Sequence, residues 1–86
     1  MICLMYFVYI LQSARDKSYY IGYTSNIENR LWEHNEGRTG YTKLKRPWSL
    51  IYQEEYKTRK EAMVREKYLK KQKSKVYLEK IMGGGL

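Results

Sequence analysis

Two strand-like segments that flank a polar turn open the chain and restrict its fold most strongly. Residues 5–11 are all aromatic, β-branched or long and apolar, a composition typical of a strand that is covered on both faces. Residues 14–18 are small or polar and predict a turn, and residues 19–24 predict a second strand. The chain therefore begins with an expected antiparallel hairpin.

The register of this hairpin decides which tyrosines meet. A turn centred near Ala14 and Arg15 places Tyr9 and Tyr20 at equal distances from the centre. Residues that are paired in this way lie opposite each other on one face of an antiparallel sheet. We therefore expect Tyr9 and Tyr20 to face each other across the hairpin.

Helix signals follow the hairpin in two places. Ser25 with Glu28 and Thr58 with Glu61 have the spacing of a capping box. The sequence thus predicts an α/β (α+β) fold, in which a small, mainly antiparallel three-stranded sheet is flanked by helices. The expected elements after the hairpin are a helix over 26–36, a basic loop over 37–47, a strand over 48–56, a helix over 59–73 and a short helix over 75–82, in the overall order β-β-α-β-α-α.

Length and charge narrow the function. With 86 residues the chain has room for a single domain, which we expect over residues 1–82, with a flexible glycine-rich tail over 83–86. Lys and Arg outnumber Asp and Glu by 17 to 9, which gives a net charge of +8. This balance favours nucleic acid as the partner, because neutralised phosphates release condensed counterions. A membrane surface would use the same charges but usually adds an amphipathic anchor.

The cysteine content and the hydropathy of the chain indicate its expected cellular location. Cys3 is the single cysteine, so the chain can form neither an internal disulfide nor a thiolate-rich zinc site, and a cytoplasmic location fits best. The apolar stretch over residues 2–11 is about half the length that a membrane-spanning helix needs. We therefore expect no membrane segment.

A carboxylate interrupts the apolar face of the second long helix. Ala62, Glu66 and Leu69 follow i, i+4, i+7 spacing, so Glu66 lies where only apolar groups are expected. Such a carboxylate must be paired, hydrogen-bonded or metal-bound to offset its lost hydration. On the first helix, Arg30 borders the expected buried side and His34 extends it. These positions are candidate site residues.

Four positions carry a resemblance to a known family. Tyr9 matches the tyrosine that closes a first motif, residues 20–22 match a second motif, Arg30 lies ten residues after Tyr20, and Glu66 lies on a later helix. In their order and spacing the chain resembles the small standalone proteins of the GIY-YIG endonuclease superfamily. Further matching positions are Leu31, His34, Asn35, Gly37, Tyr41, Thr42, Arg46 and Pro47.

The resemblance implies metal-assisted hydrolysis of a phosphodiester bond. Glu66 would hold a divalent cation, Mg²⁺ or Mn²⁺, and Arg30 would stabilise the charge of the transition state. Tyr9 would orient or deprotonate the attacking water, and His34 is the rival base. Tyr20 belongs to the same catalytic set through the second motif.

Basic side chains outside this set are the candidate nucleic-acid contacts. We expect DNA more than RNA as the substrate, and a protein partner could supply specificity to so small a domain. The sequence leaves the oligomeric state open. The candidates are Arg38, Lys43, Lys45 and Arg46 in the basic loop, and Lys67, Lys70 and Lys71 on the second long helix.

Each candidate also has a purely structural interpretation. Arg30 could pair with Glu33 or Glu36 on a solvated face, and Glu66 could pair with Lys70 one turn away. His34 could be a structural hydrogen-bonding residue. The strand tyrosines could be core residues with their hydroxyls at the surface, and the basic residues could form an ordinary solvated surface.

Departures from the family pattern leave two other functions open. Phe7 and Val8 replace the Gly and Ile of the first motif, and Tyr23 stands where the excision-repair relatives have lysine. No asparagine follows Glu66, although several nuclease relatives use one at the site. A catalytically weak or inactive nucleic-acid-binding module on the same fold is the alternative to a nuclease, and an adaptor for an acidic protein partner is a third hypothesis.

Overall fold

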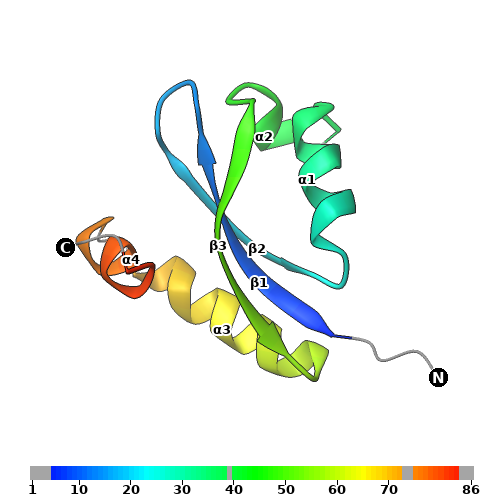
Figure 1. Cartoon of the computed structure of the whole chain (residues 1–86), viewed down its shortest axis with the longest axis vertical. Helices are drawn as coiled ribbons and strands as arrows, with labels where there is room; N and C mark the ends of the chain where they lie inside the picture. The colour runs from blue at the N-terminus through cyan, green and yellow to red at the C-terminus, as the bar shows by residue number, and fades with distance from the viewer. Residues whose placement is uncertain (1–4, 39, 73–74, 84–86) are drawn as a thin grey trace.

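Three antiparallel strands form one sheet in the order β2-β1-β3, and helices flank it (Figure 1). The computed structural model describes residues 5–38, 40–72 and 75–83. This architecture confirms the expected α/β fold and the order of its main elements. The elements are β1 (Tyr6–Ser13), β2 (Tyr19–Thr24), α1 (Ile27–Asn35), α2 (Gly40–Lys43), β3 (Trp48–Tyr56), α3 (Arg59–Lys71) and α4 (Lys75–Ile81).

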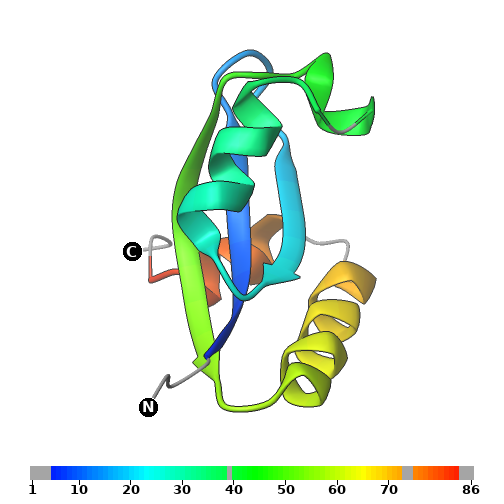
Figure 2. The same cartoon turned by 90° about the vertical axis from the view of Figure 1, so that its right-hand side faces the viewer.

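The central strand β1 is buried on both faces, as its composition predicts. Val8 and Ile10 point toward α3 and α4, whereas Tyr9 and Leu11 point toward α1. Figures 1 and 2 show α1 on one side of the sheet and α3 with α4 on the other. Alternation along a strand thus builds two separate cores, one on each face of the sheet.

Strand β3 serves both cores because it contains a β-bulge. Ile10 pairs with Tyr52, but the next residue, Leu11, pairs with Leu50, so Ile51 has no opposite partner. The extra residue reverses the alternation of the strand. Leu50 consequently packs in the core under α1, while Tyr52 packs against the core under α3 and α4.

The hairpin register differs from the expected one. Tyr9 lies opposite Gly22, and Tyr20 lies opposite Leu11, so the prediction that Tyr9 faces Tyr20 is wrong. The first strand continues to Ser13, whose hydroxyl accepts hydrogen bonds from the turn amides of residues 15 and 16. Lys17 closes the turn with a φ of 65°. These contacts move the centre of the hairpin toward Asp16, and Tyr9 and Tyr20 keep the same face.

Helix boundaries correct the sequence analysis at two points. Asn26, and not Ser25, caps α1, since its side chain accepts a hydrogen bond from the backbone N–H of Asn29. The expected basic loop contains the one-turn helix α2, which the sequence analysis did not predict. The capping box of Thr58 and Glu61 is confirmed.

The last two helices end earlier than expected, and some of the expected segments lie outside the described residues. Helix α3 is assigned to residue 71 and α4 to residue 81, so each is shorter than expected. Residues 73 and 74, Cys3 and most of the expected tail, residues 84–86, lie outside the described residues. Within the described ranges, no helix combines the length and the apolar character needed to cross a membrane.

Candidate active site

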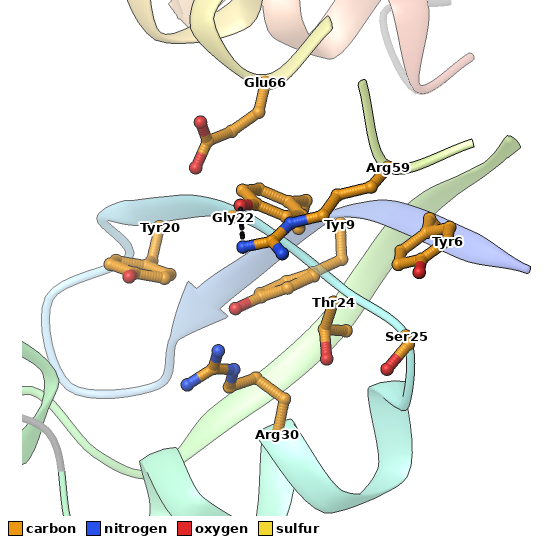
Figure 3. A pocket seen from close by; sticks show the side chains of 10 residues that line it. Tyr6, Tyr9, Tyr20, Gly22, Thr24, Ser25, Arg30, Arg59 and Glu66 are labelled. Carbon is orange, nitrogen blue, oxygen red and sulfur yellow. Dashed lines mark hydrogen bonds between the residues drawn. The ribbon is translucent and has the colours of Figure 1, made fainter. Parts of the chain in front are cut away.

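A pocket of about 460 Å³ lies at the β2 edge of the sheet, between α1 and α3. Strands β1 and β2 form its floor, α1 contributes an arginine, and α3 contributes an arginine and a carboxylate. Figure 3 shows these side chains converging from three directions. The described lining residues are Tyr6, Tyr9, Tyr20, Gly22, Tyr23, Thr24, Ser25, Arg30, Arg59 and Glu66.

Gly22 allows the ring of Tyr9 to lie across β2. A Cβ atom at position 22 would be 2.6 Å from the hydroxyl oxygen of Tyr9 and 2.8 Å from its Cζ. These distances are far shorter than van der Waals contact, so a side chain here would displace the ring. The glycine of the second motif therefore places the phenol of the first motif.

The hydroxyl of Tyr9 begins a chain of buried polar groups. It lies 3.3 Å from Nε2 of His34, and Nδ1 of His34 lies 2.8 Å from Oγ1 of Thr42. Thr42 is itself fully buried, and its carbonyl accepts a hydrogen bond from the indole N–H of Trp48. This arrangement fixes the plane of the imidazole and connects the pocket to the core.

Burial sets the protonation states of Tyr9 and His34. Burial lowers the pKa of His34 below its ordinary value of 6.5, and the nearby charge of Arg30 lowers it further. Burial also raises the pKa of Tyr9 well above its ordinary value, with a smaller contribution from neighbouring Tyr20 and opposition from Arg30. At neutral pH the pair therefore consists of a neutral phenol and a neutral imidazole.

The α1 helix is oriented by a side chain next to His34. The amide of Asn35 accepts from the backbone N–H of Trp48 at 2.6 Å and donates to its carbonyl at 3.1 Å. This double contact ties the end of α1 to the start of β3. It thereby places His34 and, one turn earlier, Arg30 relative to the sheet.

Arg30 reaches the pocket and also forms an ion pair on its own helix. Its Nη1 lies 3.5 Å from Oε1 of Glu33, and its side chain is 41% exposed. A pair this exposed contributes little to stability. Figure 3 shows the guanidinium directed toward the hydroxyl of Tyr9, so the pair with Glu33 does not remove Arg30 from the pocket.

Glu66 is the carboxylate among the described lining residues. Ala62 and Leu69 on the same helix face are fully buried, as the stripe predicts, and the Glu66 side chain is 14% exposed. Its Oε2 lies 3.1 Å from Nζ of Lys70, which confirms the alternative pairing. Its carboxylate nevertheless points into the pocket (Figure 3).

The donor set suits a hard cation that keeps most of its water. No group of three metal-ligating side chains occurs among the residues with described positions. Mg²⁺ commonly binds proteins through one or two carboxylates, with waters and substrate phosphates as its other ligands. A single inward carboxylate in a polar pocket fits this mode of binding.

Tyr20 has mainly packing contacts. Its ring centroid lies 4.8 Å from that of His34 and 6.2 Å from that of Trp48, in edge-on arrangements. It packs against the core under α1 while also lining the pocket. The ring thus shields His34 from solvent.

The predicted nucleic-acid contacts lie outside the pocket, and two of them form ion pairs with other described residues. Lys45 pairs with Asp16 at 3.1 Å and joins the loop to the hairpin turn. Lys70 pairs with Glu66 and lines a neighbouring pocket of about 350 Å³. None of the seven is among the described residues that line the main pocket. Lys70 is exposed, as are Arg38, which lies over the ring of Trp32, and Lys43, Arg46, Lys67 and Lys71.

Arg59 is the charged residue among the described pocket lining that the sequence analysis missed. It opens α3, lines the pocket and donates a hydrogen bond of 3.5 Å to the hydroxyl of Tyr23. The signal was present, because position 59 precedes Glu66 by seven residues and therefore lies on the same helix face. Tyr23 departs from the family pattern, and its hydroxyl holds this arginine.

Comparisons with known proteins agree with the fold and the motifs. A family model described as the GIY-YIG catalytic domain matches residues 5–80. The chain is 40% identical to the UPF0213 protein YazA of Bacillus subtilis, over 86% of this chain and 78% of the relative. It is 42% identical to a UPF0213 protein of Staphylococcus epidermidis, over 86% of this chain and 95% of the relative.

A solved structure supports the same family and the same fold. The solution NMR structure of a UPF0213 protein from Bacillus halodurans superposes with a TM-score of 0.59 at 30% identity. The match covers 93% of this chain and 84% of the solved chain. The resemblance that was drawn from Tyr9, Tyr20, Arg30 and Glu66 is thereby confirmed at the level of the family and the fold.

Proposed function

Because this chain belongs to the GIY-YIG family of nucleases, we propose that it is a divalent-metal-dependent endonuclease that hydrolyses phosphodiester bonds in DNA or structured nucleic acid. One observation carries the proposal. The hydroxyl of Tyr9, the guanidinium of Arg30 and the carboxylate of Glu66 are directed into the same pocket (Figure 3). The net charge of +8 supports a polyanionic substrate.

Tyr9 and His34 form the proposed path for the proton of the attacking water. A phenol with a raised pKa is a poor base by itself, but its proton can pass to the neutral Nε2 of His34, 3.3 Å away. The contact of Nδ1 with Thr42 keeps the ring in position during the transfer. In this proposal Tyr9 orients the water and His34 is the general base.

Arg30 is the proposed stabiliser of the transition state. Charge rises on the phosphoryl oxygens during in-line displacement, and a guanidinium can donate two hydrogen bonds to them. Its exposed pair with Glu33 is weak enough to exchange for a phosphate contact. Loss of a comparable oxyanion donor lowers kcat by about 10²–10³-fold.

Glu66 is the residue that would hold the metal. A bound Mg²⁺ or Mn²⁺ would act as a Lewis acid on the phosphate and lower the pKa of bound water. The carboxylate of Glu66 would exchange its contact with Lys70 for a contact with the cation. Lys70 would then be available to a phosphate of the substrate.

A cleavage assay tests the proposal. Single-stranded, duplex, branched and RNA substrates are incubated with Mg²⁺ or Mn²⁺, and wild type is compared with Glu66→Gln and Arg30→Gln. The matched controls are Glu36→Gln and Arg15→Gln, at exposed positions outside the described pocket lining. Products with wild type and both controls, and none with Glu66→Gln, are expected. Cleavage that survives Glu66→Gln would contradict the proposal.

The ion pair of Glu66 with Lys70 favours one alternative function. A lysine that already neutralises the carboxylate, together with the lack of an asparagine after Glu66, suits a nucleic-acid-binding module without cleavage activity. This alternative requires salt-sensitive binding and intact substrate in every metal condition. Any metal-dependent product from wild type that disappears in Glu66→Gln excludes it.

A further inference from the structure

Two arginines from different helices line the pocket, and the proposed reaction uses only one of them. Arg30 comes from α1, whereas Arg59 is the first residue of α3. Figure 3 shows their guanidinium groups on either side of the Tyr9 ring. The pocket therefore presents a positive group from each of the two layers that cover the sheet.

The backbone of Arg59 is held by a helix cap. The Thr58 side chain accepts from the backbone N–H of Glu61, and the Glu61 carboxylate accepts from the backbone N–H of Thr58. This reciprocal capping box fixes the first turn of α3. The side chain of Arg59 leaves this turn toward the pocket.

A phenol holds the guanidinium of Arg59. Nη2 donates to the hydroxyl of Tyr23 at 3.5 Å, and Cζ lies 6.0 Å from the centre of its ring. The ring of Tyr23 is packed against the core under α3 and α4, so this partner is anchored. Within the described residues no carboxylate pairs with Arg59, in contrast to Arg30 with Glu33 and Arg65 with Glu54. Its positive charge consequently remains available to a ligand.

We propose that Arg59 is a second phosphate-binding residue, which holds the substrate phosphodiester from the α3 side while Arg30 contacts it from the α1 side. The inference rests on the proposed function and adds a residue to it. A diester carries one negative charge, and two guanidinium groups that approach it from opposite sides would fix its position in the pocket. The phenol of Tyr23 aims the side chain without neutralising it.

The position of Arg59 predicts a role in binding. In this proposal its contact with the phosphate is already complete in the bound substrate, so Arg59 stabilises the bound substrate and the transition state to a similar degree. Loss of such uniform binding raises KM and leaves kcat unchanged. Arg59→Gln should therefore raise KM about tenfold, whereas Arg30→Gln should lower kcat.

The test compares Arg59→Gln with Arg59→Lys and with Lys60→Gln. Lys60 is the next residue of the same helix turn, is exposed, and is not among the described residues that line the pocket. Affinity for the tightest-binding oligonucleotide of the substrate panel is measured by fluorescence anisotropy at several salt concentrations, without metal. Circular dichroism checks that each variant is folded.

Arg59→Gln should reduce the slope of log affinity against log salt by about one, because one phosphate contact is lost. Arg59→Lys should keep the slope, and Lys60→Gln should match wild type. Equal slopes for Arg59→Gln and Lys60→Gln would overturn the inference. The binding measurement does not depend on cleavage, so failure of the wild type to cleave any substrate counts against the proposed function alone.

Discussion

The hydroxyl of Tyr9 lies 3.3 Å from Nε2 of His34, and both side chains are almost fully buried. Burial favours the neutral form of each group. The contact therefore joins an acid that does not ionise readily to a base that is free of its proton at neutral pH. In the proposed reaction, the pair would pass a proton inward from the pocket.

We expect cleavage to depend on pH through His34. Its pKa lies below 6.5, so the base is unprotonated at neutral pH and becomes protonated as the pH falls. The measured kcat/KM should be flat near pH 7 and fall about tenfold for each pH unit below the pKa. His34→Gln should lower kcat by about 10²-fold or more and remove this acid limb. An unchanged pH profile in His34→Gln would rule out His34 as the base.

Gly22→Ala should disturb both folding and activity. The added Cβ would lie 2.6 Å from the hydroxyl of Tyr9, and overpacking of this kind costs about 1–3 kcal/mol. Thermal or urea unfolding measures the loss, and the cleavage assay should show lower kcat because the ring moves. Gly40→Ala is the control, since a Cβ there meets no atom within 4 Å. Equal stabilities of the two variants would contradict the steric account.

Lys70→Met should strengthen metal binding at Glu66. The ammonium of Lys70 lies 3.1 Å from Oε2 of Glu66 and competes with a cation for the carboxylate. Removal of an i, i+4 ion pair should improve the Kd for Mn²⁺ about twofold or more, as measured by electron paramagnetic resonance. Lys71→Met removes a neighbouring exposed charge without this contact. If both variants bind Mn²⁺ equally, Lys70 does not compete for the site.

Glu54→Gln should destabilise the fold, more so at neutral than at acidic pH. Burial alone would raise the pKa of Glu54, but hydrogen bonds from Arg65, Tyr52 and Tyr56 outweigh it and lower the pKa below its ordinary value of 4.5. The charged form therefore stabilises the fold above pH 4.5, and this contribution is lost as the pH falls through the folded-state pKa. We expect a loss of about 1–2 kcal/mol at pH 7 in urea unfolding.

Glu55→Gln is the matched control for this measurement. Glu55 is the next residue of β3 and is exposed, so its substitution should change the free energy of unfolding by less than about 0.5 kcal/mol. The difference between the two variants should shrink between pH 7 and pH 3. A difference that is constant with pH would show that charge on Glu54 does not stabilise the fold.

The fold could be predicted well from the sequence because its signals are local. The apolar run around Val8, the capping box at Thr58 and the carboxylate at Glu66 each act within one element, and each was found in place. The first helix cap was wrong by one residue, since Ser25 and Asn26 are both good caps. Sequence alone gave no means of choosing between them.

The geometry of the site depended on contacts between elements, which a local pattern does not encode. The turn at Ser13 and Lys17 shifted the hairpin register, so that Tyr9 faces Gly22 and not Tyr20. The spacing of Arg59 and Glu66 on one helix face could be recognised in the sequence, but the contact that holds the Arg59 guanidinium could not. That contact is with a phenol on β2, which is 36 residues earlier in the chain.

Because of the bulge at Ile51, β3 contributes side chains to both cores of the protein. Before it, Trp48 and Leu50 belong to the half of the protein that contains His34, and after it Tyr52 and Tyr56 belong to the half that supports α3. A chain without this single residue would send one set of rings to the wrong side of the sheet. The count of residues between Trp48 and Tyr56 therefore matters more than the identity of residue 51, because that count keeps the two sides of the candidate site in phase.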